Sequence, residues 1–278
     1  MNRYLKALKY KLLHQKKNKF STESVLCGKK LITYPGTIRD VVDQDDAWFF
    51  YLAKHNAIIF DIGCNVGYTA ILAMIQNPNR TYVLVDPNTE ALSVANRNLL
   101  INNLGMKSFY FPGFVSDKSD DLLKFYTVGV GAAGSMNPSH ANTAALLNSF
   151  NYVKTVTLDF LYSYYNLKPD LVKIDIEGAE LLAIEGASVL AKETQCLFFI
   201  EMHMLPDFSM EQAGNKIINW CERNQYQSWY MKSKEKLSSG SMIKERGKCH
   251  LLLIPKNQPY PEYLKMINQN SPLPELIR

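Results

Sequence analysis

Several features that would assign this chain to a class of protein are missing from its sequence. It has no run of about 18 uncharged apolar residues, so we expect no membrane-spanning helix. Residues 1–18 are basic and contain no uninterrupted apolar core, so we also expect no secretory signal peptide and a cytoplasmic location.

Cysteine is also scarce, and the cysteines form none of the paired spacings typical of disulfide or zinc sites. The five cysteines are odd in number and scattered along the chain, and no two form a C-x-x-C pair. This pattern argues against a disulfide framework and against a zinc site, and it favours reduced thiols. We therefore assign no metal ligands from the sequence, although the acids and the imidazole of the acceptor side, named below, could converge on a divalent ion.

The net positive charge of the chain comes from its beginning. Residues 1–20 contain seven Lys or Arg and no acid, whereas the whole chain has 31 basic and 26 acidic residues. Leucines in this segment can share one face of a helix. Such a helix can contact an anionic membrane surface or pack lightly on its own domain, and the sequence leaves both open. No Arg-rich or aromatic-interleaved patch follows, so we expect no nucleic-acid partner.

The chain is long enough for one large core. Its 278 residues are 47% hydrophobic, which favours one domain with additions over two domains. We expect a lead-in segment over residues 1–54, a main domain over 55–255 and an extended tail over 256–278. Five of the twelve prolines lie between Pro255 and Pro274, which favours an extended tail.

The most informative motif is the apolar run of residues 58–62, which contains an acid and is followed by two glycines. Ala57 to Ile62 is typical of a buried parallel strand, and Asp61 lies where open α/β sheets bind ligands. Gly63 and Gly67 permit a sharp turn close to a ligand. The G-x-x-x-G spacing lacks the third glycine of a pyrophosphate-binding turn. Together with the carboxylate, it favours S-adenosylmethionine.

A second acid follows the next strand, 25 residues later. Asp86 ends the apolar run that begins at Thr81, and a carboxylate there is placed to accept hydrogen bonds from a ribose diol. Asp86 precedes Pro87, so it can also cap a helix, and the two roles are compatible.

Hydrophobic periodicity predicts the remaining helices. We expect them over residues 66–76, 88–103, 160–165, 178–190 and 210–224, with Asp159 capping the third. The glycine-rich stretch 129–138 is typical of a surface loop or of a lid over a substrate.

A third motif, Leu171 to Glu180, reads Leu-Val-Lys-Ile-Asp-Ile-Glu-Gly-Ala-Glu and delivers acids at the end of a strand. With it, the chain resembles the FkbM-type family of S-adenosylmethionine-dependent methyltransferases over about residues 55–205. The other segments that carry the resemblance are Asp61–Gly67, Ser116–Lys118, Val156–Asp159, Glu185–Ala187 and Leu197–His203. The resemblance implies an α/β fold: a Rossmann-like class I methyltransferase sheet of about seven strands, mostly parallel with an antiparallel last strand, and helices on both faces.

The resemblance also implies a cofactor site for S-adenosyl-L-methionine. It places Asp61, Gly63, Asn65 and Gly67 around the methionine part of the cofactor, Asp86 at the ribose, and Ser116 or its neighbours at the adenine. Asn65 offers a donor and an acceptor that suit an amino-acid group. Cys64 departs from the alanine expected there.

Four residues at or just past strand ends are candidates for the acceptor side: Asp175, Glu177, Glu201 and His203. Methyl transfer to a hydroxyl requires alignment and removal of a proton. With an ordinary pKa near 6.5, His203 is the best general base by residue type, and Glu201 can orient it or bind a hydroxyl. Alternatively, the two acids before Gly178 brace the turn into the next helix, and His203 bonds a backbone carbonyl.

The sequence therefore predicts an O-methyltransferase that acts on a sugar, a glycan or another small metabolite. An NAD-dependent oxidoreductase on a Rossmann sheet is one alternative, which the missing third glycine disfavours. A non-catalytic adaptor at a membrane surface is another, which the intact cofactor motif disfavours.

Overall fold

The structure is a computed structural model that describes residues 21–39, 41–130, 134–205 and 208–276. The basic helix expected within residues 1–20 lies outside this range, so its contact with a membrane stays a prediction. Within the described ranges, no helix combines the length and the apolar character needed to cross a bilayer.

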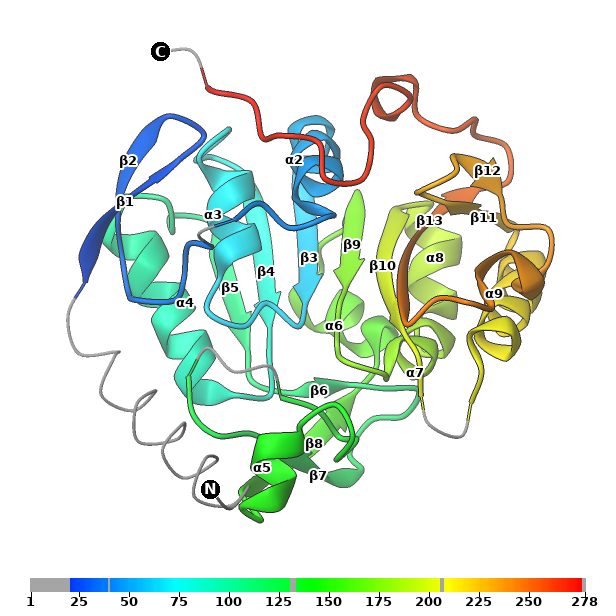
Figure 1. Ribbon diagram of the computed structural model, residues 1–278, viewed down its shortest axis with the longest axis horizontal. Helices are drawn as coiled ribbons and strands as arrows, with labels where there is room; N and C mark the ends of the chain where they lie inside the picture. Colours follow the sequence, from blue (N-terminus) through cyan, green and yellow to red (C-terminus); the bar gives the residue numbers. More distant parts are fainter. Residues whose placement is uncertain (1–20, 40, 131–133, 206–207, 277–278) are drawn as a thin grey trace.

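The centre of the fold is an eight-stranded sheet (Figure 1), in the order β12-β11-β13-β10-β9-β3-β4-β5. The five strands from β10 to β5 pair in parallel, whereas β13 lies between β10 and β11 and is antiparallel to both. The expected sheet of about seven strands is confirmed, with the two-residue β12 added at one edge. The strands are β3 (Ile58–Ile62), β4 (Thr81–Val85), β5 (Ser108–Phe111), β9 (Leu171–Ile174), β10 (Leu197–His203), β11 (Tyr226–Tyr230), β12 (Glu235–Lys236) and β13 (Lys248–Pro255).

Helices cover both faces of this sheet because its central strands are apolar on both sides. In β3, Ile59 faces one helical layer, whereas Phe60 and Ile62 face the other. The first layer contains α2 (Asp46–His55), α3 (Tyr68–Met74) and α4 (Thr89–Ile101); the second contains α6 (Leu158–Tyr165), α7 (Glu180–Glu185), α8 (Ser188–Thr194) and α9 (Met210–Asn224). The bounds of α9 match the prediction, and its Ser209 forms a capping box with Gln212.

Two helix predictions were wrong. The helix expected over residues 178–190 is two helices, α7 and α8, separated at Gly186, where a Cβ would lie 2.4 Å from the carbonyl oxygen of Ser116. The N-cap of α6 is Thr157, not Asp159. Instead, the Asp159 carboxylate accepts hydrogen bonds from the backbone N–H groups of Val189 and Leu190 at the start of α8.

Smaller elements surround the main sheet. A hairpin of β1 (Thr22–Leu26) and β2 (Lys29–Thr33) precedes it. A second sheet of β6 (Phe114–Val115), β8 (Phe150–Val156) and β7 (Leu122–Tyr126) lies with α5 (Asn142–Leu146) at the bottom of Figure 1. The short 3₁₀ helices η1 (Gly240–Ile243) and η2 (Glu262–Leu264) complete the fold.

The C-terminal tail packs against the first helical layer, near the top of Figure 1. The Trp48 indole in α2 donates a hydrogen bond to the carbonyl oxygen of Ile267, at 3.1 Å. Further along, the Leu276 backbone N–H bonds to the carbonyl of Cys27 in the turn of the β1–β2 hairpin. The tail therefore holds α2 and the hairpin to the domain. All five cysteines are free and buried.

Candidate active site

A cavity of about 300 Å³ lies where β3, β4 and β9 end. Open α/β sheets bind ligands at this end of their parallel strands. The lining residues come from four places: the lead-in loop (Gly36, Thr37, Arg39), the glycine turn and α3 (Gly63, Cys64, Asn65, Val66, Tyr68, Thr69), the end of β4 (Asp86, Pro87, Asn88) and β9 with its extension (Lys173, Asp175, Ile176, Glu177), together with Phe114, Phe125 and Gly134.

The two glycines permit close packing between elements. Gly63 has a φ of +85°, and a Cβ there would lie 1.9 Å from the carbonyl oxygen of Asp175. Gly67 has a φ of +83°, and its Cβ would lie 2.8 Å from that of Ala95 in α4. Only glycine therefore lets this turn lie against both β9 and α4. Between them, the buried Asn65 Oδ1 has no hydrogen-bond partner among the described residues.

Asp61 lies behind the turn and does not line the cavity. Its Oδ2 accepts hydrogen bonds from Thr69 Oγ1 at 2.5 Å and from the Tyr82 hydroxyl at 2.9 Å. Its Oδ1 lies 3.7 Å from the Nζ atom of Lys173. The side chain is fully buried, so it fixes α3, β4 and β9 around the turn. The direct cofactor contact expected of Asp61 stays a prediction, and this geometry favours a supporting role.

Asp86 lines the cavity at the end of β4. Its two oxygens accept hydrogen bonds from the backbone N–H groups of Asn65 and Asn88, both at 2.8 Å. Burial raises its pKa to about 6, although these two hydrogen bonds oppose the rise. Asp86 does not cap α4, because the Asn88 side chain accepts from the N–H groups of the first turn. Each carboxylate oxygen retains a lone pair for a ribose hydroxyl.

Ser116 does not line the cavity: its hydroxyl hydrogen-bonds Asp117 at 3.1 Å. Its neighbour Phe114 does line it, with Phe125, and the two ring centroids are 6.1 Å apart. These rings offer the flat apolar surface that an adenine needs. Sequence reasoning did not select them, because apolar residues of short strands have the same pattern whether they border a core or a ligand.

The lead-in loop contributes a wall that the sequence did not indicate. Arg39 donates hydrogen bonds to Asp43 and Asp46, each at 3.1 Å. Its guanidinium lies 4.7 Å from the centroid of the Tyr68 ring. The Tyr68 hydroxyl in turn donates to Asp46 at 2.8 Å. These contacts connect the loop to α2 and α3.

On the acceptor side, Asp175 and Glu177 line the cavity, as their place after β9 predicts. The buried Nζ atom of Lys173 donates to Asp175 Oδ2 at 3.1 Å. Burial opposes the charge of this lysine, but Asp175 and Asp61 together raise its pKa above the ordinary value. Lys173 therefore places a permanent positive charge in the cavity wall beside Asp175.

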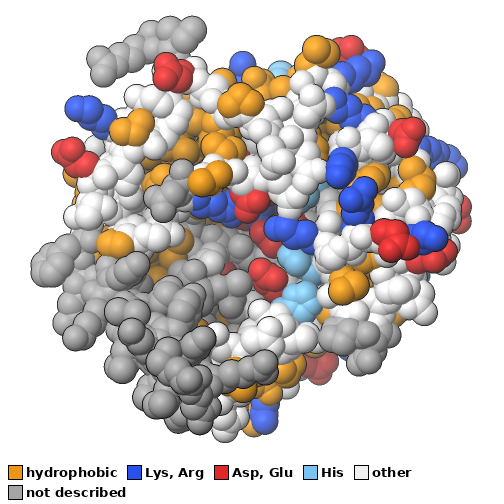
Figure 2. All heavy atoms as spheres, in the orientation of Figure 1, with side chains coloured by type: hydrophobic (Ala, Val, Ile, Leu, Met, Phe, Trp, Pro, Cys, Tyr) orange, Lys and Arg blue, Asp and Glu red, His pale blue; other side chains and the backbone are white. Residues whose placement is uncertain are grey.

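His203 lies close to several carboxylates. Histidine and acidic side chains lie side by side in the hollow of the face drawn in Figure 2. Its Nδ1 is 2.9 Å from Glu180 Oε1, and its Nε2 is 3.5 Å from Glu177 Oε2. Glu201 is farther from it, at 4.0 Å. The residue that orients His203 is thus Glu180, which also accepts from the N–H of Gly178 and so braces the turn.

The electrostatic surroundings of His203 change its expected role. Burial alone would lower its pKa, but the hydrogen bond and charge of Glu180 outweigh burial. With Asp175 and Glu177 they raise the pKa to about 9. A pKa near 9 favours the protonated imidazole at neutral pH, which argues against His203 as the general base; its catalytic role stays a prediction. Burial raises the pKa of Glu177 although His203 opposes the rise, so Glu177 is a stronger base than an exposed glutamate.

Two further side chains, His140 and Glu201, lie near Glu177 and His203 on the acceptor side. His140 lies 3.6 Å from Glu177 through Nδ1, and its Nε2 is 2.8 Å from the carbonyl of Met204. Glu201 does not line the cavity; it forms an ion pair with Lys248 and lies near His250. Burial alone would raise the pKa of Glu201, but these two neighbours lower it. Glu201 is thus committed to other partners.

Comparison with known proteins agrees with this geometry. The methyltransferase FkbM domain model matches residues 61–228, which is more than half of the chain. The chain belongs to the FkbM methyltransferase family. It is therefore an S-adenosylmethionine-dependent methyltransferase, as the resemblance predicted. A search of curated proteins gave no match.

Similar solved structures include the methyltransferase FkbM from Methylobacillus flagellatus, at 14% identity over 71% of this chain with a TM-score of 0.44. The chain spans only 43% of that protein's length. TYW2 from Pyrococcus horikoshii in complex with MeSAdo matches at 10% identity over 92% of this chain and 84% of that chain, with a TM-score of 0.47. A putative O-methyltransferase from Klebsiella pneumoniae matches at 11% identity, 92% and 91% coverage, and a TM-score of 0.43.

The cavity fits S-adenosylmethionine by the chemistry of its donors and acceptors. The unpartnered Asn65 Oδ1 suits the ammonium of an amino acid, and the Asp86 carboxylate suits a ribose diol. The rings of Phe114 and Phe125 suit an adenine. Acids at the end of β9 suit the positive charge of a sulfonium.

Proposed function

We propose that this FkbM-family methyltransferase methylates a hydroxyl group of a sugar, a glycan or another small metabolite. The observation that supports it best is that Asp175 and Glu177 lie in the same cavity as the glycine turn and Asp86. Carboxylates at that place accept hydrogen bonds from hydroxyl groups and can take up a proton. The residues proposed to bind the cofactor and those proposed to bind the acceptor hydroxyl thus line one cavity.

We assign the cofactor contacts as follows. Gly63, Asn65 and Gly67 hold the methionine part, and Asp86 accepts hydrogen bonds from the ribose. The rings of Phe114 and Phe125 enclose the adenine in place of Ser116. Asp61 supports the turn from behind through Thr69 and Tyr82. When bound, S-adenosylmethionine supplies an electrophilic methyl group on a positively charged sulfur.

The protein's task at the acceptor is to hold the hydroxyl and to take up its proton. Glu177 is our proposed general base, because it lines the cavity and its pKa is raised by burial. The protonated His203 holds Glu177 in place, and Glu180 holds His203. Asp175, fixed by Lys173, is the proposed second acceptor for the substrate hydroxyl.

Two experiments test this function. Calorimetric titration with S-adenosylmethionine, with NAD as the control ligand, should give heat with the first alone. Incubation with methyl-labelled S-adenosylmethionine and a panel of sugars, glycans and cell-extract metabolites should then label an oxygen, which NMR of the product identifies. Binding of NAD alone would return the protein to the oxidoreductase alternative. Binding of neither would favour the adaptor, and a label on nitrogen or carbon would contradict the hydroxyl acceptor.

A further inference from the structure

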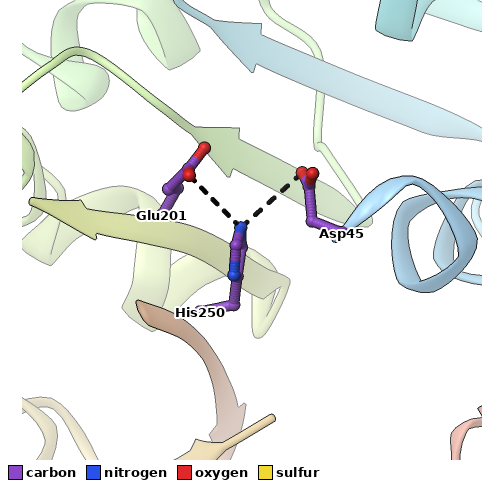
Figure 3. A group of neighbouring side chains, drawn as sticks. All are labelled: Asp45, Glu201 and His250. Carbon is purple, nitrogen blue, oxygen red and sulfur yellow. Dashed lines mark ion pairs between the residues drawn. The ribbon is translucent and has the colours of Figure 1, made fainter. Parts of the chain in front are cut away.

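A second group of ionisable side chains lies beside the acceptor end, outside the cavity. Asp45 is the N-cap residue of α2, Glu201 lies in β10 and His250 lies in β13 (Figure 3). Glu201 and His250 are direct cross-strand partners in the antiparallel β10–β13 pair. The mechanism proposed above uses none of the three, although all are buried.

The distances in this group do not suit hydrogen bonds. His250 Nε2 lies 3.7 Å from Asp45 Oδ2 and 3.7 Å from Glu201 Oε1. An N–H···O hydrogen bond spans at most about 3.2 Å. Two atoms that each lie about 2.1 Å from one metal ion are separated by about 3–4 Å. The three ligand atoms all lie within 4.8 Å of one another.

The group also contains buried atoms without partners. His250 is 3% exposed, and its Nε2 has no hydrogen-bond partner among the described residues. That nitrogen points between the two carboxylates in Figure 3. Asp45 is 5% exposed, yet its side chain caps no backbone N–H of α2. Buried polar atoms of this kind are costly unless a further group satisfies them.

The imidazole is held in this direction by aromatic packing. Its ring stacks on Phe199 at 5.7 Å between centroids and lies 5.6 Å from the Trp48 ring. The packing of these two rings thus holds His250 Nε2 in its direction toward the two carboxylates (Figure 3).

We propose that Asp45, Glu201 and His250 bind one divalent transition-metal ion, Zn²⁺ or Mn²⁺. One imidazole with two carboxylates is a ligand set suited to these ions, and the two negative charges balance the cation. Water completes the coordination. A separate cavity of about 230 Å³ is lined by one of the three ligands, His250, together with Lys248 and Gln44, and we propose it as the route of the ion from solvent. The bound ion joins the lead-in segment to two strands of the sheet.

Lys248 competes with the ion for Glu201. Its ammonium forms an ion pair with Glu201 Oε1, and its side chain is 41% exposed, so it can turn toward solvent. Without metal, this lysine neutralises Glu201. Replacing it with an uncharged residue should therefore strengthen metal binding, because a like charge beside the site is removed.

The test uses the full chain, stripped with chelator and titrated with Zn²⁺ and Mn²⁺. We expect one equivalent of metal to remain after gel filtration, and Co²⁺ to give a ligand-field absorption spectrum. Asp45→Asn and His250→Gln should each weaken binding by more than the roughly 10- to 100-fold cost of losing an outer-shell partner. Lys248→Met should tighten binding several-fold, roughly the effect of removing one nearby charge.

His203→Gln is the matched control, because Asp175, Glu177 and His203 form the other group of possible ligands among the described residues. This variant should bind the metal at least as tightly as the unaltered chain, because the protonated imidazole that it removes lies 4.0 Å from Glu201. Absence of bound metal in the unaltered chain would overturn the proposal and leave a water-bridged charge cluster. Full binding by Asp45→Asn, or loss of binding in His203→Gln alone, would also overturn it. If His250→Gln does not fold, metal binding by Asp45→Asn and Lys248→Met still tests the proposal.

Discussion

The cofactor side and the acceptor side of the cavity are built in different ways. On the cofactor side, glycines, backbone N–H groups and two acids come from one continuous β-α-β unit, residues 58–88. On the acceptor side, charged side chains converge from β9, β10, β13 and the region around α5. The first is a local structure that a motif can encode. The second exists only when distant segments pack together.

If the cofactor side depends on backbone packing, a single Cβ should disrupt it. Gly63→Ala should cost about 2–5 kcal/mol of unfolding free energy, because it adds left-handed strain to a clash with Asp175. Urea unfolding measures this. Gly129→Ala is the control, since Gly129 has a φ of +101° but, apart from its chain neighbours, none of the described residues lies within 4 Å of its added Cβ. Equal losses in the two variants would show that strain alone, without close packing, sets the cost.

If the acceptor side carries the proton transfer, removing one carboxylate should separate catalysis from cofactor binding. Glu177→Gln should lower kcat by about 10²- to 10⁴-fold, the usual contribution of a general base. The dissociation constant for S-adenosylmethionine should stay unchanged in calorimetry. Glu185→Gln is the control, because Glu185 pairs with Arg223 at the surface. Full turnover by Glu177→Gln would show that another residue is the general base.

Asp86 should show the opposite behaviour, affecting the cofactor and not the chemistry. Asp86→Asn should weaken S-adenosylmethionine binding about 10- to 100-fold, the value of hydrogen bonds to a charged group. Because burial raises the Asp86 pKa to about 6, the unaltered protein should lose affinity as the pH falls through 6. The variant should lack this dependence. Asp120→Asn, at an exposed acid, serves as the control, and an identical pH profile for Asp86→Asn would contradict the assignment.

The smallest expected effect concerns stability. The folded pKa of His203 is about 9, above its ordinary value of 6.5. Its contribution is therefore fully present below about pH 6.5 and is lost as the pH rises through 9. Between pH 7 and 9.5 the unaltered chain should lose about 2 kcal/mol more unfolding free energy than His203→Gln. Urea unfolding at the two pH values measures this. If the unaltered chain and His203→Gln lose the same unfolding free energy, the charge of His203 does not stabilise the fold.

The same contrast explains how much the sequence predicts. The parallel sheet, the glycine turn and the place of Asp86 follow from apolar runs and the spacing between them, because each depends on residues close in the chain. Whether a strand-end side chain faces the cavity or the core is not a local property. The sequence therefore could not show that Asp61 and Ser116 lie outside the cavity, whereas Asp86 and Phe114, a neighbour of Ser116, line it.

The partners of the acceptor residues could not be predicted for a related reason. Glu180, rather than Glu201, orients His203, and this depends on how α7 packs against β10. Lys248 and His250 reach Glu201 through the antiparallel pairing of β13 with β10, whose register no motif encodes. The raised pKa of His203 follows from that packing, which residue type alone does not indicate.

The lead-in segment has a practical consequence for dissecting this enzyme. The family match starts at residue 61, yet Thr37 and Arg39 form part of the cavity wall, and α2 supplies the buried Trp48. A shortened chain that begins at residue 55 would retain every recognised motif and still lose one side of its binding chamber. The smallest unit able to work as a catalyst therefore extends well upstream of the region by which its family is recognised.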